Sequence, residues 1–166
     1  PSFKQVLAAV EDAWTSRRGE VGDAAEKIVA SLEMPSRSPG APPVDADTVI
    51  RASQLLMHNA DRKHGGFGGG PKFPTPANLE FQLSALDLVP EADARAVIDH
   101  LVFTGREMAR RGLFDQLGGG FHRYCVDDSW TIPHFEKMLY DQGLLLRFYA
   151  ELLRRGGPED ELAWPL

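Results

Sequence analysis

Residues 112–141 read GLFDQLGGGFHRYCVDDSWTIPHFEKMLYD, and residues 65–74 read GGFGGGPKFP. Both segments are dense in glycine, aromatic and ionisable residues, and they interrupt a chain that otherwise has mostly helical periodicity. Connecting segments carry binding and catalytic residues more often than the elements that support them. We therefore expect helices to form the scaffold and these two glycine-rich segments to form a site.

Residues 91–110 have the clearest helical pattern. Val97, Leu101 and Met108 recur on one face, acidic residues occupy the first turn, and Gly112 follows the last. On the other side of the long glycine-rich segment, a second helical stripe predicts a helix from about Pro133 to Leu153. Between these two helices, residues 121–126 are predicted to pair as a short hairpin.

Further towards the N-terminus, Thr75 and Pro76 predict a helix start, with a capping hydroxyl followed by proline at the first helical position. Asp45 predicts another start, for a helix that carries Val49 and Met57 on its apolar face. Basic residues followed by Gly65 predict where that helix ends.

The chain begins with a pattern of two helices that break near Gly19. Residues 35–43 have the Pro, Gly and Ser content of a linker. We therefore predict boundaries that divide the chain into 1–34, 35–43 and 44–166. Because no alternation of strands and helices appears, the fold class expected is all-α, built from paired helices with long glycine-rich loops and at most a short β-hairpin.

The composition excludes several functional classes. The 166 residues are 43% hydrophobic and 25% charged, which is ordinary for a globular chain with a real core. A net charge of −6 and scattered arginines predict that nucleic acid is not a partner. No apolar run is long enough to span a membrane and no signal pattern opens the chain, which predicts a cytoplasmic protein without a membrane partner. The lone Cys125 excludes an internal disulfide.

The first glycine-rich segment is neither a P-loop nor a dinucleotide fingerprint, because Pro71 follows Gly70 where those motifs require other residues. Its glycines allow Phe67, Lys72 and Phe73 to fold over the end of a helical bundle. Two interpretations stay open: Lys72 lines a pocket, or the segment is a rigid cap with Lys72 in solvent.

In the second segment, alternation along an extended chain places His122 and Tyr124 on one face and Arg123 on the other. His122 is a candidate acid or base, because a histidine titrates near neutral pH, with a packed, hydrogen-bonded histidine as the alternative.

In a helix starting at Pro133, His134, Lys137 and Asp141 share a face, and Glu136 and Tyr140 form an i, i+4 pair on an adjacent face. The exposed N–H groups of that helix start disfavour a charged imidazole, so a neutral His134 is a candidate base. The alternative is a structural polar network in which Lys137 and Asp141 form an ion pair.

No metal site is predicted, because the sequence lacks paired ligands such as H-E-x-x-H and the cysteines of a zinc deaminase. Asp127 or Asp128 with Glu136 or Asp141 forms a candidate carboxylate pair for glycosidase-like chemistry. Aromatic residues such as Trp130 offer flat walls for a sugar ring.

With GGFGGGPKFP at 65–74 and GGGFHRYCVDDSWTIPHFEKMLYDQ at 118–142, the chain resembles the thioredoxin-domain-containing proteins related to a spermatogenesis-associated thioredoxin-like protein. The resemblance implies that residues 1–34 are the terminal helical segment of a thioredoxin-like domain. It implies that 44–166 are the first helical hairpins of an (α/α)6 toroid similar to N-acylglucosamine 2-epimerases and six-hairpin glycosidases. The chain would then be a fragment whose exposed helix faces favour self-association.

Together these arguments predict a protein that binds or transforms a carbohydrate-like small molecule by epimerase, isomerase or glycosidase-like acid–base chemistry, without a metal or other cofactor. The alternative is a non-enzymatic scaffold or a thioredoxin-linked redox or binding module. The predicted catalytic residues are His122, His134, Glu136 and Asp141. The predicted substrate-binding residues are Phe67, Lys72, Phe73, Arg123, Asp127, Trp130, Lys137 and Tyr140.

Overall fold

A computed structural model describes residues 1–32, 43–163 and 165. The chain divides into two compact units, Pro1–Pro43 and Val44–Leu166. Nearly all of the predicted linker, residues 35–42, lies outside the described residues. Over the described residues the structure is helical and contains isolated β-bridges in place of strands, which confirms the predicted all-α class. The six-hairpin toroid stays a prediction.

The first unit contains α1 (Phe3–Ser16) and α2 (Arg18–Leu32), so the two predicted helices are present. They meet at Arg17, slightly before the predicted break. Ser2 and Gln5 start α1 with a capping box, in which each side chain satisfies the backbone N–H of the other residue. Neither helix contains a buried residue.

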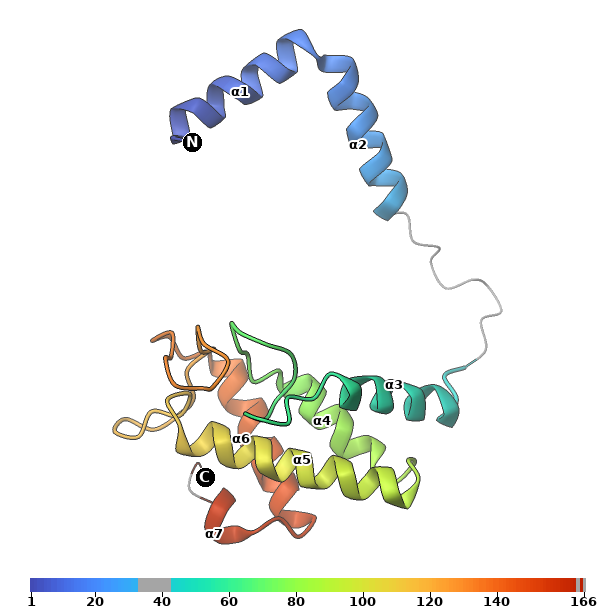
Figure 1. The fold of residues 1–166 in the computed structure, drawn as a ribbon, viewed down its shortest axis with the longest axis vertical. Helices are drawn as coiled ribbons and strands as arrows, with labels where there is room; N and C mark the ends of the chain where they lie inside the picture. Colours follow the sequence, from blue (N-terminus) through green and yellow to red (C-terminus); the bar gives the residue numbers. More distant parts are fainter. Residues whose placement is uncertain (33–42, 164, 166) are drawn as a thin grey trace. The chain divides into compact units, whose positions relative to one another are not determined.

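The second unit contains α3 (Ala46–His58), α4 (Pro76–Ala85), α5 (Glu91–Arg110), α6 (Leu139–Arg154) and the short α7 (Glu159–Leu162). Helix α4 packs against α3 and α6, and α5 contacts α4, α6 and α7. Figure 1 shows the two glycine-rich segments at one end of this unit, beside the C-terminal end of α5 and the start of α6. The core between the helices is formed mainly by Leu79, Leu83, Val97, Leu101, Met108, Leu145, Phe148, Tyr149 and Leu152.

Helix α5 has the predicted bounds, and its predicted stripe is buried. The prediction that Asp45 caps α3 is also confirmed, since its carboxylate accepts the N–H of Thr48 at 2.8 Å. However, α3 ends at His58 and does not continue towards Gly65. The chain turns there because the Asp61 carboxylate accepts the backbone N–H groups of Lys63 and His64.

Helix α4 starts at Pro76 as predicted, but the predicted capping by a hydroxyl is wrong. Thr75 has a left-handed conformation with φ of 43°, and none of the residues that the structure describes forms a hydrogen bond with its buried hydroxyl. This conformation is unusual for a β-branched residue. Thr75 also lies at the edge of the cavity described below.

The predicted helix start at Pro133 is wrong, because α6 begins only at Leu139. Residues 132–136 are extended and pair with residues 123–126. Their backbone bonds are Val126 N–H to Ile132, His134 N–H to Tyr124 and Arg123 N–H to Glu136, at 2.8–2.9 Å. The predicted hairpin within 121–126 is therefore replaced by pairing with distant segments. The helical face shared by His134, Lys137 and Asp141 does not exist.

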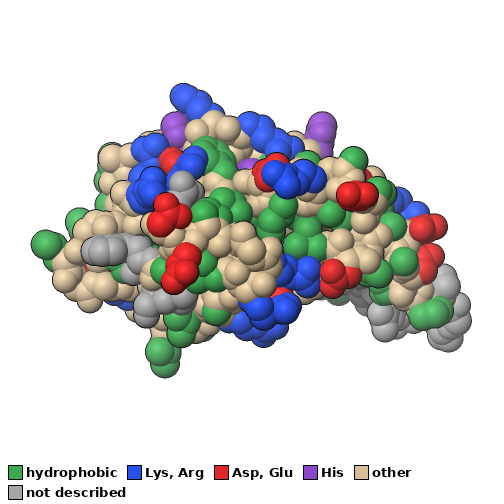
Figure 2. Space-filling model, turned by 90° about the horizontal axis from the view of Figure 1, so that it is seen from below, with side chains coloured by type: hydrophobic (Ala, Val, Ile, Leu, Met, Phe, Trp, Pro, Cys, Tyr) green, Lys and Arg blue, Asp and Glu red, His purple; other side chains and the backbone are tan. Residues whose placement is uncertain are grey.

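Large apolar side chains remain exposed in both units, including Trp14 on α1, Leu117 and Phe135 in the long glycine-rich segment, and Leu139 on α6. Figure 2 shows one face on which apolar side chains reach the surface between acidic and basic ones. In the described part of the chain, no helix combines the length and apolar character needed to cross a membrane.

Candidate functional site

The two glycine-rich segments contact each other along their backbones. Lys72 and Cys125 exchange two hydrogen bonds, of 2.7 and 2.9 Å, and Cys125 also bridges to Pro133. Three extended segments, 71–73, 123–126 and 132–136, therefore lie side by side. This is the meeting of the two segments that the sequence led us to expect.

The pairing places three rings in a stack across these segments. Phe73 stacks on Tyr124 with ring centroids 4.6 Å apart, and Tyr124 stacks on His134 with centroids 4.9 Å apart. Tyr124 was considered only for its alternation with His122 and was not among the predicted site residues. Its position between Phe73 and His134 could not be found without knowing which segments pair.

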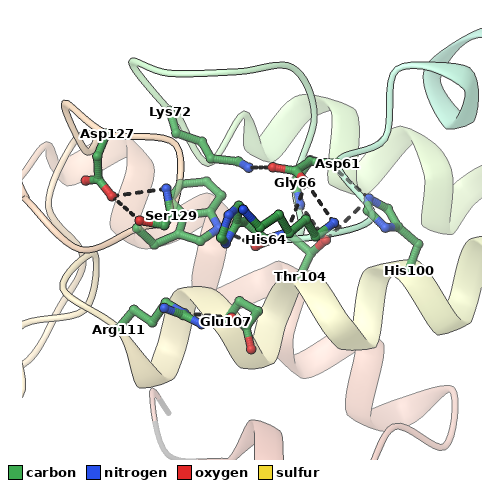
Figure 3. A network of polar contacts seen from close by, with 12 residues as sticks. Asp61, His64, Gly66, Lys72, His100, Thr104, Glu107, Arg111, Asp127 and Ser129 are labelled. Carbon is green, nitrogen blue, oxygen red and sulfur yellow. Dashed lines mark hydrogen bonds and ion pairs between the residues drawn. The ribbon is translucent and has the colours of Figure 1, made fainter.

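Asp61, Lys72 and Trp130 form a buried contact that we call the latch, and Figure 3 shows Lys72 pointing towards Asp61. The fully buried Lys72 ammonium pairs with the Asp61 carboxylate and lies 5.2 Å from the centre of the Trp130 ring. The Trp130 indole N–H donates to the carbonyl of His64 at 2.8 Å. Lys72 is thus not in solvent, which corrects that part of the rigid-cap interpretation, and its predicted role in substrate binding stays a prediction. The ion pair and the neighbouring ring satisfy its charge internally.

Polar side chains of α5 hold the first glycine-rich segment in place. The Thr104 hydroxyl accepts the N–H of Gly66 at 2.8 Å, and the His100 imidazole bonds the Gly66 carbonyl at 3.0 Å (Figure 3). Burial lowers the pKa of His100 and favours its neutral form. Phe67, a predicted substrate-binding residue, packs its ring against that imidazole. Sequence reasoning missed His100 and Thr104, although polar residues within an apolar stripe were the available signal.

Asp127 is occupied within its own loop. Its carboxylate accepts the hydroxyl and N–H of Ser129 and the N–H groups of Thr131 and Ile132. Burial by itself would raise the pKa of Asp127, but these hydrogen bonds outweigh burial and hold the pKa well below its usual range. Asp127 therefore organises the loop that carries Trp130, the aromatic member of the latch.

Lys137 also has a structural partner. Its ammonium lies 2.6 Å from the Asp115 carboxylate and 2.6 Å from the Gly119 carbonyl, so the predicted ion pair with Asp141 is wrong. Asp115 in turn accepts the N–H groups of Leu117 and Gly118. The Gly118 and Lys137 hydrogen bonds keep the pKa of Asp115 far below its usual range. These contacts close the turn that precedes Phe121.

The two candidate imidazoles lie in different surroundings. His122 is 7% exposed and packs edge-on against Phe135, and its buried Nδ1 has no hydrogen-bond partner in the described part of the chain. Burial, followed by the nearby Lys137 charge, lowers the pKa of His122 and favours the neutral form. His134 is half-exposed on the ring stack, with its Nδ1 3.2 Å from Glu136. The Glu136 carboxylate is also bonded by Arg123 at 3.1 Å.

A cavity of about 270 Å³ opens beside the stack, between the starts of α4 and α6. Asp141, in the first turn of α6, is 7% exposed and has no hydrogen bond or ion pair to another described residue. Burial raises the pKa of Asp141, against a smaller opposing effect of the Arg123 charge. The cavity is lined by Phe73, Pro74, Thr75, Pro76, Arg123, Tyr140 and Asp141.

Four predicted site residues line this cavity: Phe73, Arg123, Tyr140 and Asp141. Two more lie beside it, because Glu136 bonds Arg123 and His134 contacts Glu136. Larger hollows lie between α4 and α6 and between α3 and α5, with volumes of about 390 and 470 Å³. Neither contains a predicted site residue, and the arginines of the first are paired with acids. The described residues contain no group of three or more potential metal ligands.

No family model matches the chain. It is 33% identical over 162 residues to human spermatogenesis-associated protein 20, an alignment that covers 95% of this chain and 21% of that protein. The rat protein of the same name is 35% identical over 162 residues, with 95% and 20% covered. An uncharacterized protein of Caenorhabditis elegans is 46% identical over 150 residues, with 90% and 20% covered. The chain thus spans about a fifth of the length of these curated relatives.

Proposed function

We propose that this chain forms part of a site that binds or transforms a small carbohydrate-like polyol, with Asp141 as its acid–base group. The observation that carries the proposal is an aspartate residue that is 7% exposed, has no hydrogen bond or ion pair to another described residue, and lines a cavity. A buried polar group without a partner costs folding free energy, so a site for a ligand is a physical reason to retain it.

The chemistry of Asp141 suits proton transfer. Its raised pKa brings the carboxyl closer to neutral pH than an exposed aspartate, and a group near the working pH both accepts and releases protons efficiently. In the predicted catalytic set, Asp141 takes the acid–base role. Glu136 supports it by holding Arg123, and His134 contacts the same Glu136 carboxylate.

The walls of the cavity suit a sugar ring. Phe73 and Tyr140 are partly exposed aromatic residues whose flat faces pack against the apolar C–H face of a ring. The Arg123 guanidinium, held by Glu136, offers donors to hydroxyl or carbonyl oxygens. Polar groups on one wall and aromatic faces on another are typical of polyol sites.

Among the described residues, the cavity is lined by one carboxylate. Glycoside hydrolysis generally uses two flanking the bond to be cleaved, whereas epimerisation and isomerisation need proton transfer next to a carbonyl. Proton abstraction of the epimerase or isomerase type therefore fits this cavity better than hydrolysis. We propose the same kind of activity for the longer proteins that match this chain.

The test is an NMR titration of the isotope-labelled chain with glucose and with sorbitol, a linear polyol. We expect chemical-shift changes concentrated at Phe73, Tyr140 and Asp141, and their loss in Asp141→Asn. The control is Asp128→Asn, which makes the same change at an exposed residue of the same segment. If neither compound shifts the cavity signals at saturation, the proposal is wrong.

One set of contacts favours the alternative of a non-enzymatic scaffold. Lys72, Asp127, Trp130 and Lys137 all make internal contacts that hold the glycine-rich segments together. A scaffold would need these contacts and no ligand. In that case Asp141→Asn would leave every interaction of the intact protein unchanged, while breaking the buried latch would abolish them.

A further inference from the structure

The charges around the cavity do not cancel. Arg123 is paired with Glu136, which also faces His134, and the nearby Lys137 is paired with Asp115. The remaining lining residues, Phe73, Pro74, Thr75, Pro76 and Tyr140, carry no charge. When Asp141 is ionised, the described charges around the cavity therefore sum to one net negative charge, because Arg123, the cation near Asp141, is already paired with Glu136.

The walls of the cavity also favour a cation. The faces of aromatic rings carry partial negative charge and attract cations, most strongly where water is excluded. Phe73 is 43% exposed, and Tyr124 stacks against it on the side of the extended segments. Tyr140 lies next to Asp141 in the first turn of α6. A cavity lined by aromatic side chains and by a carboxylate without a partner among the described residues is chemically complementary to an organic ammonium group.

We infer that the cavity takes a ligand with a primary ammonium group, with Asp141 as its counter-ion and Phe73 and Tyr140 as its walls. This inference rests on the proposed function and narrows the polyol to an amino-substituted one. The ammonium group forms the charge-assisted hydrogen bonds that Asp141 lacks. The cavity volume of about 270 Å³ lies at the small end of the usual range of roughly 300–1,000 Å³ for ligand sites, which suits one sugar ring.

The inference is tested by comparing glucosamine, glucose and N-acetylglucosamine as probes, by NMR titration at constant ionic strength and at a pH where the amine is protonated. We expect glucosamine to bind at least about tenfold more tightly than glucose, because an ion-paired hydrogen bond is stronger than a neutral one. N-acetylation removes the positive charge, so N-acetylglucosamine should not share the advantage. Asp141→Asn should abolish the preference, and Asp128→Asn should retain it.

A second measurement uses the unmodified chain, so it does not depend on the folding of a variant. The carboxyl carbon signal of Asp141 is followed through a pH titration with saturating glucosamine and with saturating glucose. A bound ammonium stabilises the ionised carboxylate, so glucosamine should lower the pKa of Asp141 relative to glucose.

The outcomes separate the two proposals. Equal affinities for glucose and glucosamine, both perturbing the cavity, overturn the ammonium inference and leave the proposed function standing. A glucosamine preference that survives in Asp141→Asn also overturns the inference, because the amine is then bound elsewhere. Failure of all three sugars to perturb the cavity overturns both.

Discussion

Asp141 and Lys72 are buried ionisable residues with opposite surroundings. The Lys72 ammonium has a carboxylate partner and an aromatic ring beside it, whereas the Asp141 carboxylate has no partner among the described residues. A buried charge without compensation destabilises a fold. Lys72 therefore contributes to the structure of the latch, and the proposed function assigns the acid–base role to Asp141.

Replacement of Asp141 by asparagine should raise the melting temperature at neutral pH. The folded-state pKa of Asp141 is raised, so its ionisation costs stability as the pH increases through that pKa. Asparagine resembles the protonated form and avoids this cost. We expect a gain of about 2–4 °C near neutral pH, corresponding to about 1 kcal/mol for a chain of this size. The gain should disappear in acid, where Asp141 is protonated, and circular dichroism at both pH values measures it. A loss of stability at neutral pH would contradict the argument.

Replacement of Lys72 by methionine should destabilise the second unit. The Asp61 carboxylate would lose its counter-ion, and breaking one partner of a buried pair costs about 3–5 kcal/mol. Asp61→Asn keeps an oxygen for the Lys63 and His64 N–H groups, so the double variant Lys72→Met/Asp61→Asn should recover part of the loss. Urea unfolding measures all three variants. A double variant no more stable than Lys72→Met alone would show that the charge of Asp61 is not the cause.

At the scale of elements, the start of α6 shows where pairing with another segment outweighs the helical preference of the local sequence. Proline followed by an apolar stripe predicted a helix from Pro133, and the same residues are extended because Tyr124 and Arg123 occupy their backbone groups. Pairing between segments overrides local helical preference. Helix α5 has no competing segment, and its bounds agree with its periodicity.

Amide hydrogen exchange should distinguish the paired segments from the start of α6. The amides of Arg123, Val126 and His134 donate to backbone carbonyls of the neighbouring segment and should exchange slowly. The amides of Leu139 and Tyr140 lie at the start of α6, where N–H groups lack helical partners, and should exchange quickly. NMR-detected exchange measures each amide. Protection that runs continuously from His134 through Tyr140 would indicate the helix predicted from the sequence.

Gly112 and Gly143 should respond oppositely to alanine. A side-chain carbon at Gly112 would lie 2.5 Å from the Thr131 carbonyl oxygen, so Gly112→Ala should force backbone segments apart at a cost of about 1–3 kcal/mol. Gly143 lies in α6 with open space around it, so Gly143→Ala should stabilise the helix by about 1 kcal/mol. Chemical denaturation of both variants measures the difference. Equal effects would mean that the approach of Gly112 to Thr131 is not a constraint.

At the scale of the whole molecule, the two units differ in how they use apolar residues. The second unit has a continuous core, whereas α1 and α2 bury no residue and expose Phe3, Leu7, Val10 and Trp14. Exposed apolar faces of this kind promote association. The sequence predicted self-association through exposed helix faces of the second unit, and this stays a prediction; the exposed faces of α1 and α2 offer a second surface for it.

Removal of residues 1–43 should reduce self-association, because it removes the exposed apolar faces of α1 and α2. Sedimentation velocity at increasing concentration compares the full chain with residues 44–166. As a control that keeps the full length, Leu7→Lys and Val10→Lys together place charges on the exposed face of α1. A full chain that stays monomeric at high concentration would contradict the prediction, and association of 44–166 alone would place the surface in the second unit.

The sequence by itself determined the helical class, the bounds of α5, the Asp45 cap and the two segments that carry the candidate site. These depend on periodicity and on contacts within a few residues, which a single segment contains. Tertiary structure decided which candidates share a cavity. It buried Lys72 and Trp130 in the latch, gave Asp127 and Lys137 partners in turns, and left Asp141 without a partner among the described residues. The candidates were separated in this way by the pairing of residues 71–73, 123–126 and 132–136. Backbone hydrogen bonds between these segments set the direction of each side chain, and the spacing of residues within one segment does not reveal which segments pair.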